Sequence, residues 1–293
     1  MGPVKTFSPA GPRAMATRFR SWNGLQESRD MDVVTTCSTA LVTPKGREER
    51  TETVLQETPV QIALNEEIIG SSMVLPADLE EFAVGFLFGQ GYLTQPGQVV
   101  ETLVCDEGLV TVYARVDEDA APNQEEMVVT SGCGGTGRVA RRFLEGPFPG
   151  LQETSMTMDQ IGQLIRKTLS ISSLQRETHC VHGCGFWSDG RFQVAYEDVG
   201  RHNAVDKVIG ALLLDRFPAS GAMFTTGRLT SDMVMKCARM GVPMVLSRTA
   251  PSSLGVDIAR RAGMTLIAYA RPERLNVFCG LERIALQPGL WPG

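Results

Sequence analysis

The second half of the chain alternates short apolar runs with amphipathic segments, and this alternation limits the fold more than any other feature. Strands are expected at residues 192–196, 222–226, 243–246 and 264–269. Helical spacing of apolar residues lies between these runs, and Gly241 and Gly263 follow two of the expected helices. Such alternation is typical of a parallel or mostly parallel sheet covered by helices. We therefore predict an α/β fold.

The first half of the chain is less regular. Alternating apolar residues predict a strand at 60–64, and helical spacing predicts a helix over 79–87. Shorter strand-like runs follow at residues 99–104, 109–116 and 127–130. We expect three regions: a flexible N-terminal extension (1–50), a smaller β-rich α+β part (51–150) and the α/β domain (151–293). Near the start of the last region, Thr157 and Gln160 predict a helical capping box.

Charge and cysteine content exclude several classes of partner. The 293 residues carry a formal net charge of −5, and binding of duplex nucleic acid needs many Lys and Arg contacts, so nucleic acid is not an expected partner. No apolar run approaches the roughly 20 residues that cross a bilayer, so no membrane partner is expected. Seven cysteines, without an apolar secretory segment near the start, predict reduced thiols and a cytoplasmic location.

Arginine recurs in the loops that follow the expected strands of the α/β domain. Parallel strands send these loops to one edge of the sheet, where open α/β sheets bind their ligands. The arginines are Arg201, Arg228, Arg248, Arg271 and Arg274. A planar guanidinium matches the geometry of a phosphate group, so the sequence predicts a phosphorylated or diphosphate-containing ligand.

Two further observations bear on that prediction. Asn203, Ser231 and either Ser252 or Ser253 lie where helices are expected to begin, and helix starts favour anions. The alternative is that the arginines cap helices, or form surface ion pairs with residues such as Asp198 and Asp232. Acidic residues beside Arg201, including Asp198, are expected to be structural partners, not acid–base groups.

Cys133 lies in the segment 131–137, in which four of seven residues are glycine. Glycine lets such a loop change conformation, and it keeps the sulfur accessible. Arg138, Arg141 and Arg142 follow closely and would favour the thiolate, which is the reactive form. The sequence suggests a sulfur-carrying thiol here, with a cysteine of no function as the alternative.

A second group of chemically active residues is Cys180, His182 and Cys184. On a strand, all three would face one side, as zinc ligands could. Structural zinc sites usually add a distant second pair of ligands, which the sequence lacks. A buried strand with a hydrogen-bonded histidine is therefore the favoured interpretation.

Residues 196–210 (YEDVGRHNAVDKVIG) closely resemble the hallmark segment of the formate dehydrogenase accessory sulfurtransferases, the FdhD/NarQ family. Further similar segments lie at 82–91, 227–236, 250–259 and 265–284, so that the resemblance spans about 55–285. It implies a homodimer with a cytidine-deaminase-like, three-layer α/β/α domain and a smaller N-terminal part.

The resemblance also implies a function. The family takes sulfur from a cysteine desulfurase as a persulfide. It delivers the sulfur to the molybdenum cofactor, bis-molybdopterin guanine dinucleotide, that enters formate dehydrogenase or a related molybdoenzyme. Cys133 would be the catalytic residue, and neither a metal nor a permanently bound cofactor is expected. The residues expected to bind the guanine-nucleotide part of this ligand are Arg201, His202, Arg228, Ser231, Tyr269, Ala270, Arg271, Pro272, Glu273, Arg274, Leu275 and Asn276.

The chain departs from the family pattern in one important place. Thr136 stands where the family has the second cysteine of a Cys-x-x-Cys motif, so Cys180 or Cys184 could supply the missing thiol. The deaminase glutamate has no counterpart after His182, so base deamination is not expected. Two alternatives to sulfur transfer are a chaperone that only binds the cofactor, and a zinc hydrolase using His182 with the two cysteines.

Overall fold

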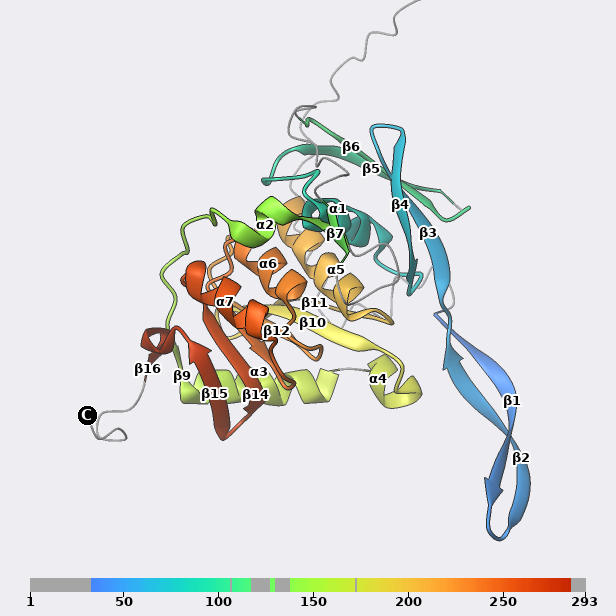
Figure 1. The fold of residues 1–293 in the computed structure, drawn as a ribbon. Helices are drawn as coiled ribbons and strands as arrows, with labels where there is room; N and C mark the ends of the chain where they lie inside the picture. Colours follow the sequence, from blue (N-terminus) through green and yellow to red (C-terminus); the bar gives the residue numbers. More distant parts are fainter. Residues whose placement is uncertain (1–32, 106, 117–126, 130–137, 172, 286–293) are drawn as a thin grey trace, which may run out of the picture.

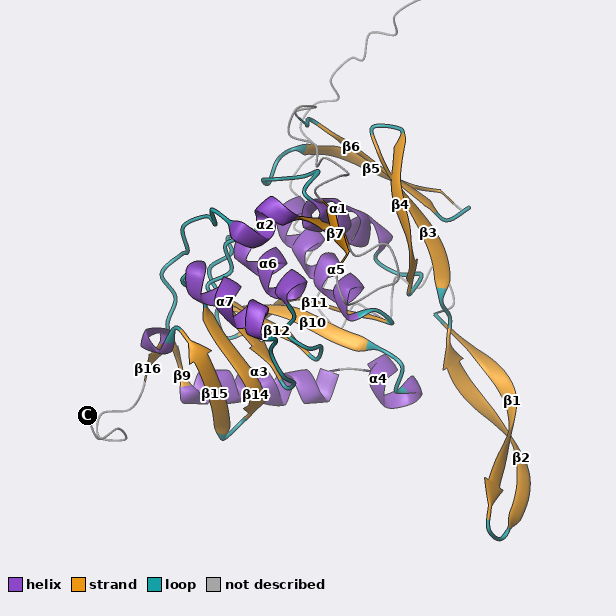
Figure 2. Cartoon of the chain, viewed as in Figure 1, coloured by secondary structure: helices purple, strands orange, loops and turns teal. Residues whose placement is uncertain are grey.

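The computed structural model describes residues 33–105, 107–116, 127–129, 138–171 and 173–285 (Figure 1). Sheets and helices are mixed along the chain, as the predicted α/β class requires (Figure 2). Within these described ranges, no helix is both long enough and apolar enough to cross a membrane.

A six-stranded sheet forms the centre of the C-terminal part. Its strands lie in the order β11 (Arg191–Asp198), β10 (His182–Ser188), β12 (Ala222–Thr225), β13 (Met244–Ser247), β14 (Thr265–Arg271) and β15 (Arg274–Cys279). β12, β13 and β14 are parallel, and β10 is antiparallel to both of its neighbours. β11 therefore runs in the same direction as these three strands, and the carboxyl ends of all four lie at one edge.

The predicted sheet needs one correction. Residues 271–276 were expected to be a loop, but β14 continues to Arg271 and β15 begins at Arg274, antiparallel to β14. Only Pro272 and Glu273 form the turn. The sequence prediction was wrong here because a tight hairpin with polar outer residues lacks the continuous apolar run that marks a buried strand.

Helices cover both faces of the sheet and make three layers (Figure 1). The helices α5 (Arg201–Leu214), α6 (Ser231–Arg239) and α7 (Ser253–Arg261) lie on one face, and α3 (Met158–Ile171) lies on the other. Successive strand residues point to opposite faces of the sheet and into two different apolar clusters. Met223 packs on the α5 side and Phe224 on the α3 side. Burial on both faces explains why the strands are apolar throughout.

The start of α3 confirms the predicted capping box. The Thr157 N–H donates to Gln160 Oε1 at 2.8 Å, and the Gln160 N–H donates to Thr157 Oγ1 at 3.2 Å. Just before the helix, β9 (Met156–Thr157) pairs in parallel with β16 (Ile284–Ala285), which follows a short 3-10 helix at Leu281–Arg283.

The N-terminal sheet packs on a single helix. Its strands are β4 (Glu67–Val74), β3 (Thr58–Leu64), β6 (Leu109–Ala114) and β5 (Val99–Cys105), and the helix is α1 (Leu79–Gln90). α1 also lies against α5 at very short range. A Cβ atom at Gly85 would lie 1.8 Å from the Asp206 carbonyl oxygen, and one at Gly210 would lie 1.8 Å from the Glu81 carbonyl oxygen. One apolar core therefore runs from β3 through α1 and α5 to β14.

The expected N-terminal extension is partly ordered structure. β1 (Val34–Thr43) and β2 (Gly46–Leu55) form a hairpin that projects from the body (Figure 1). The prediction of a flexible extension was wrong for residues 34–50, and residues 1–32 lie outside the described ranges. Both faces of the hairpin are largely exposed, so its sequence lacks the polar–apolar alternation that a half-buried strand shows.

Short elements flank the segment that contains Cys133. β7 (Met127–Val129) pairs with β8 (Arg138–Ala140), and α2 (Arg141–Glu145) follows directly. Residues 130–137, with Cys133 and Thr136, lie outside the described ranges. The end of α2 is held in place by Arg261, which donates to the carbonyl oxygens of Leu144 and Glu145, both at 2.8 Å.

Candidate anion-binding site

The candidate site follows the edge of the six-stranded sheet where β11, β12, β13 and β14 end. Because β10 is antiparallel, its first residue also lies at this edge, and His182 pairs with Asp198 at the end of β11. Backbone hydrogen bonds join the loops in series. The Leu229 N–H donates to the Ala250 carbonyl at 3.0 Å, and the Tyr269 N–H donates to the Thr249 carbonyl at 3.0 Å.

Two hydroxyl groups fix the loop that follows β12. Ser247 Oγ and Thr249 Oγ1 both donate to the Gly227 carbonyl, at 2.6 and 2.7 Å. A side chain at Gly227 would also collide with Arg201, since its Cβ would lie 2.9 Å from Arg201 Cβ. The loop therefore has one conformation, in which the Arg201 side chain packs directly over Gly227.

Arg201 is the most unusual residue of the site. Its Nε and Nη2 atoms are buried and have no hydrogen-bond partner among the described residues. A charged group that is buried without a partner carries a desolvation cost of about 1–3 kcal/mol or more. Arg201 is also the first residue of α5, whose N-cap Gly200 provides no capping side chain. An anion bound here would meet both the guanidinium and a helix start.

His182 lies in the same positive environment. Its Nδ1 atom is 3.4 Å from Thr226 Oγ1, which also accepts the Gly183 N–H at 3.0 Å. Burial lowers the pKa of His182 below its usual 6.5, and the charges of Arg201, His202 and Arg228 lower it further. The imidazole is therefore neutral at pH 7, and it is surrounded by cationic groups that would favour an anion.

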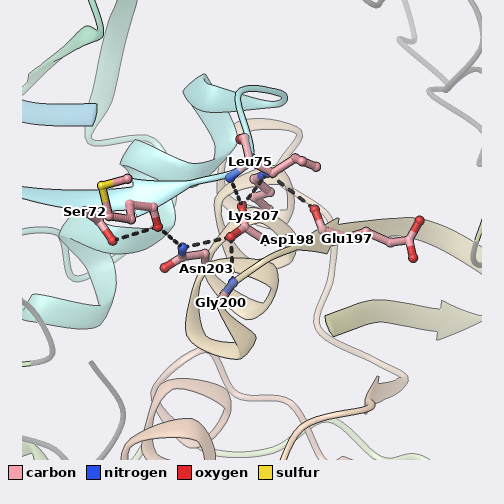
Figure 3. Close-up of polar contacts among 8 residues, drawn as sticks. Ser72, Leu75, Glu197, Asp198, Gly200, Asn203 and Lys207 are labelled. Atoms are coloured by element: carbon pink, nitrogen blue, oxygen red, sulfur yellow. Dashed lines mark hydrogen bonds and ion pairs between the residues drawn. The ribbon is translucent and has the colours of Figure 1, made fainter. Parts of the chain in front are cut away.

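A buried network holds the start of α5 in place (Figure 3). The carboxylate of Asp198 pairs with Lys207 Nζ at 2.8 Å, and both side chains are fully buried. Asp198 also accepts hydrogen bonds from the N–H groups of Leu75 and Gly200, at 3.2 and 2.9 Å. These contacts join the end of β11, the start of α5 and the segment between β4 and α1.

The network settles two sequence predictions. Asp198 is a structural ion-pair partner, as predicted, but its partner is Lys207 and not an arginine. Asn203 was expected to offer a helix start to the ligand, and this was wrong. Its amide lies within the first turn of α5 and donates to the Met73 carbonyl and to Asp198, both at 2.8 Å.

His202 lies behind the site, in an ion pair that joins two helices. Its Nε2 atom is 2.5 Å from Asp232 Oδ2 on α6, and Thr230 Oγ1 donates to the other oxygen at 2.5 Å. Burial alone would raise the pKa of Asp232, but the hydrogen bond and charge of His202 outweigh it and hold that pKa far below its usual value. One turn further along both helices, Asp206 pairs with Lys236 at 2.6 Å.

Residues 269–276 form a second part of the edge. Tyr269 has a left-handed backbone (φ 50) at an irregularity in the β14–β15 ladder, and its side chain is exposed. Arg271 donates to the carbonyls of Arg248 and Ala270, at 3.2 and 2.8 Å, while Arg274 is exposed. Ala270 is fully buried, so its side chain cannot face a ligand.

The predicted loops share one edge, but they do not meet at one point. Neighbouring strands are about 4.8 Å apart, so β12 and β14, with β13 between them, are separated by about 10 Å. Arg228 follows β12, whereas Arg274 begins β15 on the far side of β14, so these two backbone positions are further apart still. None of the ion pairs in the described ranges includes one of the five loop arginines, which argues against the surface-pair alternative.

The second group of cysteines does not form the arrangement that zinc would need. Cys180 precedes β10 and is exposed, whereas Cys184 is buried, with its Sγ 3.4 Å from the sulfur of Met223. Burial raises the pKa of Cys184 well above its usual value. His182 and Cys184 share one face of β10, as expected, but the expectation was wrong for Cys180, which lies before the strand. A buried neutral thiol is also unsuited to replace the cysteine missing at Thr136.

Sequence reasoning missed several residues that build the site. Thr226, Gly227, Ser247 and Thr249 act through contacts between loops that are distant in sequence, and no local pattern marks them. The paired helices did carry a signal. His202 and Asp206 on α5, like Asp232 and Lys236 on α6, are spaced by four residues, which puts each pair on one helix face.

These features define a class: a three-layer α/β protein whose sheet edge is suited to an extended anionic ligand. The model of the FdhD/NarQ family matches residues 55–285. The chain therefore belongs to the FdhD/NarQ family.

Individual relatives agree with this assignment. The chain is 32% identical over 248 residues to the sulfur carrier protein FdhD of Wolinella succinogenes, covering 82% of this chain and 85% of the relative. It is 35% identical over 215 residues to the protein of the same name from Sulfurisphaera tokodaii, covering 72% and 82%. A crystal structure from Desulfotalea psychrophila, described as a formate dehydrogenase accessory protein, matches with a TM-score of 0.78. That match has 49% identity and covers 86% of this chain and all of the other.

Proposed function

We propose that this protein is a sulfur carrier in the maturation of formate dehydrogenase, acting as a sulfurtransferase through a persulfide on Cys133. The observation that carries the proposal is the similarity over most of the chain to proteins named sulfur carrier protein FdhD. A carrier that depends on reduced thiols would work in the reducing cytoplasm.

The loading step needs one accessible thiolate. The Cys133 thiolate attacks the outer sulfur of a persulfide on a cysteine desulfurase. A new S–S bond forms on Cys133, the old S–S bond breaks, and the desulfurase cysteine leaves as a thiolate. Delivery of the terminal sulfur as sulfide needs two electrons, which a second thiolate would supply by attacking the inner sulfur of Cys133: a disulfide forms, the persulfide S–S bond breaks, and sulfide leaves for the molybdenum cofactor. That cofactor is the cargo and not a permanently bound group. Thr136 cannot act as a resolving thiol, so Cys180, which is exposed, remains the candidate second thiol.

The sheet edge would hold the nucleotide part of the cargo. Arg201 and Arg228, with the start of α5, would bind a diphosphate, and the segment 269–276 would contact the guanosine. Two nitrogen atoms of Arg201, Nε and Nη2, support this assignment, because the described residues leave them buried without a partner and a phosphate oxygen would satisfy them. The candidate residues are spread along the edge from β11 to β15, which leaves room for an extended ligand.

Other parts of the proposal come from family membership. The protein would act as a homodimer, and formate dehydrogenase or a related molybdoenzyme would be the client. The three layers around the mixed sheet are compatible with a cytidine-deaminase-like domain. A second candidate function is a chaperone that binds the cofactor without sulfur transfer, which the threonine at position 136 favours.

Replacing Cys133 separates the two functions. We expect Cys133→Ala to lose the persulfide formed with a cysteine desulfurase, detected by mass spectrometry, and to lose nearly all support of formate dehydrogenase activity. Its affinity for GDP should stay unchanged, because the nucleotide subsite is intact. The matched control is Cys105→Ala, which removes an exposed thiol at the end of β5. If Cys133→Ala still supported full formate dehydrogenase activity, the chaperone function would replace the sulfur carrier.

A further inference from the structure

The β1–β2 hairpin has no role in the proposed sulfur transfer. Within the described ranges its two strands pair only with each other, in a register that runs from Val34 opposite Leu55 to Thr43 opposite Gly46. The hairpin extends away from the two larger sheets (Figure 1). Only its base is attached, where Val34 and Leu55 pack against the small apolar cluster of Val33, Leu75, Leu174 and Val181.

A hairpin of this kind should not be stable by itself. An isolated two-stranded hairpin is at best marginally stable in water, and a third strand or a packed face is normally needed. Nine consecutive residues of β1 are exposed, and among them Leu41 and Val42 expose 40% and 73% of their surface. Ten paired residues on each strand therefore require a further stabilising contact.

The two outer edges of the hairpin differ in charge. β2 carries five charged residues, and two ion pairs lie along it, Arg47 with Glu49 at 3.0 Å and Arg50 with Glu48 at 2.8 Å. Charged side chains on an edge strand oppose the addition of another strand. β1 has the sequence VTTCSTALVT, with no charge and six β-branched residues. The β1 edge therefore lacks this protection and has a composition that favours pairing.

We propose that β1 pairs antiparallel with the β1 strand of a second copy of this chain, making a continuous four-stranded sheet. A two-fold axis at Ser38 would place Ser38 opposite Ser38 of the other copy and Val34 opposite its Val42. Every opposed residue is then uncharged. The backbone groups of the β1 edge are hydrogen-bonded in both copies, so both copies use the same surface, as a two-fold interface requires.

The same arrangement covers the exposed tip of the hairpin. In antiparallel pairing, the tip of one copy lies beside the base of the other. Leu41 and Val42 would then approach the base of the second copy's hairpin, where Val34 and Leu55 are only partly buried. A second copy therefore offers both a matching edge and partly exposed apolar side chains at the right end of the strand. This inference rests on the proposed homodimer and specifies its interface, but it does not depend on sulfur transfer.

A pair of lysine substitutions tests the interface. Ser38 and Thr51 lie directly opposite each other in the hairpin and are both exposed, but only Ser38 is on β1. Ser38→Lys would bring two like charges together across the two-fold axis. We expect it to weaken dimerisation of the full chain by about ten-fold, whereas Thr51→Lys should leave the dimer unchanged. Analytical ultracentrifugation measures both, and circular dichroism checks that each variant is folded.

Hydrogen exchange identifies the occupant of the edge. Amides of β1 should be protected in the wild-type dimer, and the protection should fall when the protein is diluted. A monomeric wild type, or a Ser38→Lys dimer as tight as wild type, would overturn the proposal. Protection of β1 that does not change with concentration would also overturn it, because the edge would then be covered from within one chain. Persulfide loading of Cys133 should be normal in both lysine variants, so failure of the interface is distinguishable from failure of the sulfur carrier.

Discussion

At the scale of single residues, the site is defined by charges that the protein leaves uncompensated. Asp198, Asp206 and Asp232 each have a basic partner within the core, at Lys207, Lys236 and His202. Arg201, at the sheet edge, has buried N–H groups that the described residues do not satisfy. Because a buried donor without a partner is costly, this contrast separates the aspartates, which join elements of the fold, from Arg201, for which we propose an anionic ligand.

The pKa of His182 should report ligand binding. It lies below 6.5 in the free protein because burial and three nearby cationic groups disfavour the imidazolium. A bound diphosphate adds negative charge, so we expect GDP to raise the pKa of His182. Affinity for GDP should then increase as the pH falls through the range between the bound and free pKa values. The chain has three histidines, so NMR titration of their ring protons with and without GDP can follow each one.

The same shift gives the sign of a stability effect. The folded state holds the His182 proton less tightly than the unfolded state, so stability should rise with pH from the folded pKa up to about 6.5.

Two arginine variants serve as controls for the GDP prediction. Arg201→Gln should weaken GDP binding about ten-fold or more, while Arg260→Gln on the exposed side of α7 should not. An unchanged His182 pKa at saturating GDP would place the nucleotide elsewhere.

At the scale of elements, the contact between α1 and α5 decides how the two parts of the chain are joined. The helices lie so close that glycine is the only residue that fits at positions 85 and 210. Most interior glycines weaken a helix by about 1 kcal/mol relative to alanine, because of backbone entropy. These two are retained because a methyl group would strike the backbone of the opposite helix, which cannot move aside as a side chain could.

Gly85→Ala should therefore destabilise the protein despite its better helix propensity. We expect the free energy of unfolding to fall by about 3 kcal/mol or more, since overpacking against rigid backbone exceeds the usual cost. Urea denaturation measures the change. Gly150→Ala is the matched control, because no atom lies within 4 Å of the position that its methyl group would take and its backbone is not left-handed. Equal stability of the two variants would show that the helices separate easily.

At the scale of the whole molecule, the N-terminal sheet and the α/β domain share one core. Apolar residues of β3, α1, α5 and β14 belong to a single buried cluster, and Asp198 bonds to Leu75 across the same boundary. Domains that can unfold separately usually meet through smaller and more polar interfaces. The boundary expected near residue 150 therefore separates the two sheets along the chain, but it does not divide the apolar core.

We accordingly expect one cooperative unfolding transition. Amides of β3, in the N-terminal sheet, and of β13, in the α/β domain, should lose their protection from hydrogen exchange at the same urea concentration. The reason is that the two parts share one core and neither stays folded without the other. Hydrogen exchange in a urea series measures this. The β1–β2 hairpin serves as an internal comparison, since its few contacts with the body predict earlier exchange in the monomer. Loss of protection in β3 well before β13 would contradict a shared core.

Local sequence patterns predicted most helices and strands of the α/β domain, but not which elements pack against one another. The capping box at Thr157 and the helix of α1 were predicted well because capping and helical spacing involve residues a few positions apart. The hairpin β1–β2 was missed because an exposed hairpin shows no apolar pattern, and β15 was missed because its first residues belong to a short polar turn that reads as a loop. At the sheet edge, Arg201 and Arg228 follow strands as the sequence predicted, and their role in binding stays a prediction. The roles expected for Asn203 and Cys184 were wrong, because burial depends on the packed neighbours.

The sequence by itself determined the α/β class, the order of most strands and helices along the chain, and the arginines that follow the strands. These depend on periodicity and loop composition, which are local properties of a chain. Only the tertiary structure decided that β10 runs antiparallel between β11 and β12, and that Lys207 and not an arginine neutralises Asp198. It also decided that two nitrogen atoms of Arg201 are buried without a partner among the described residues. Strand order, charge pairing and burial arise from contacts between distant segments, and such contacts form only when the whole core packs.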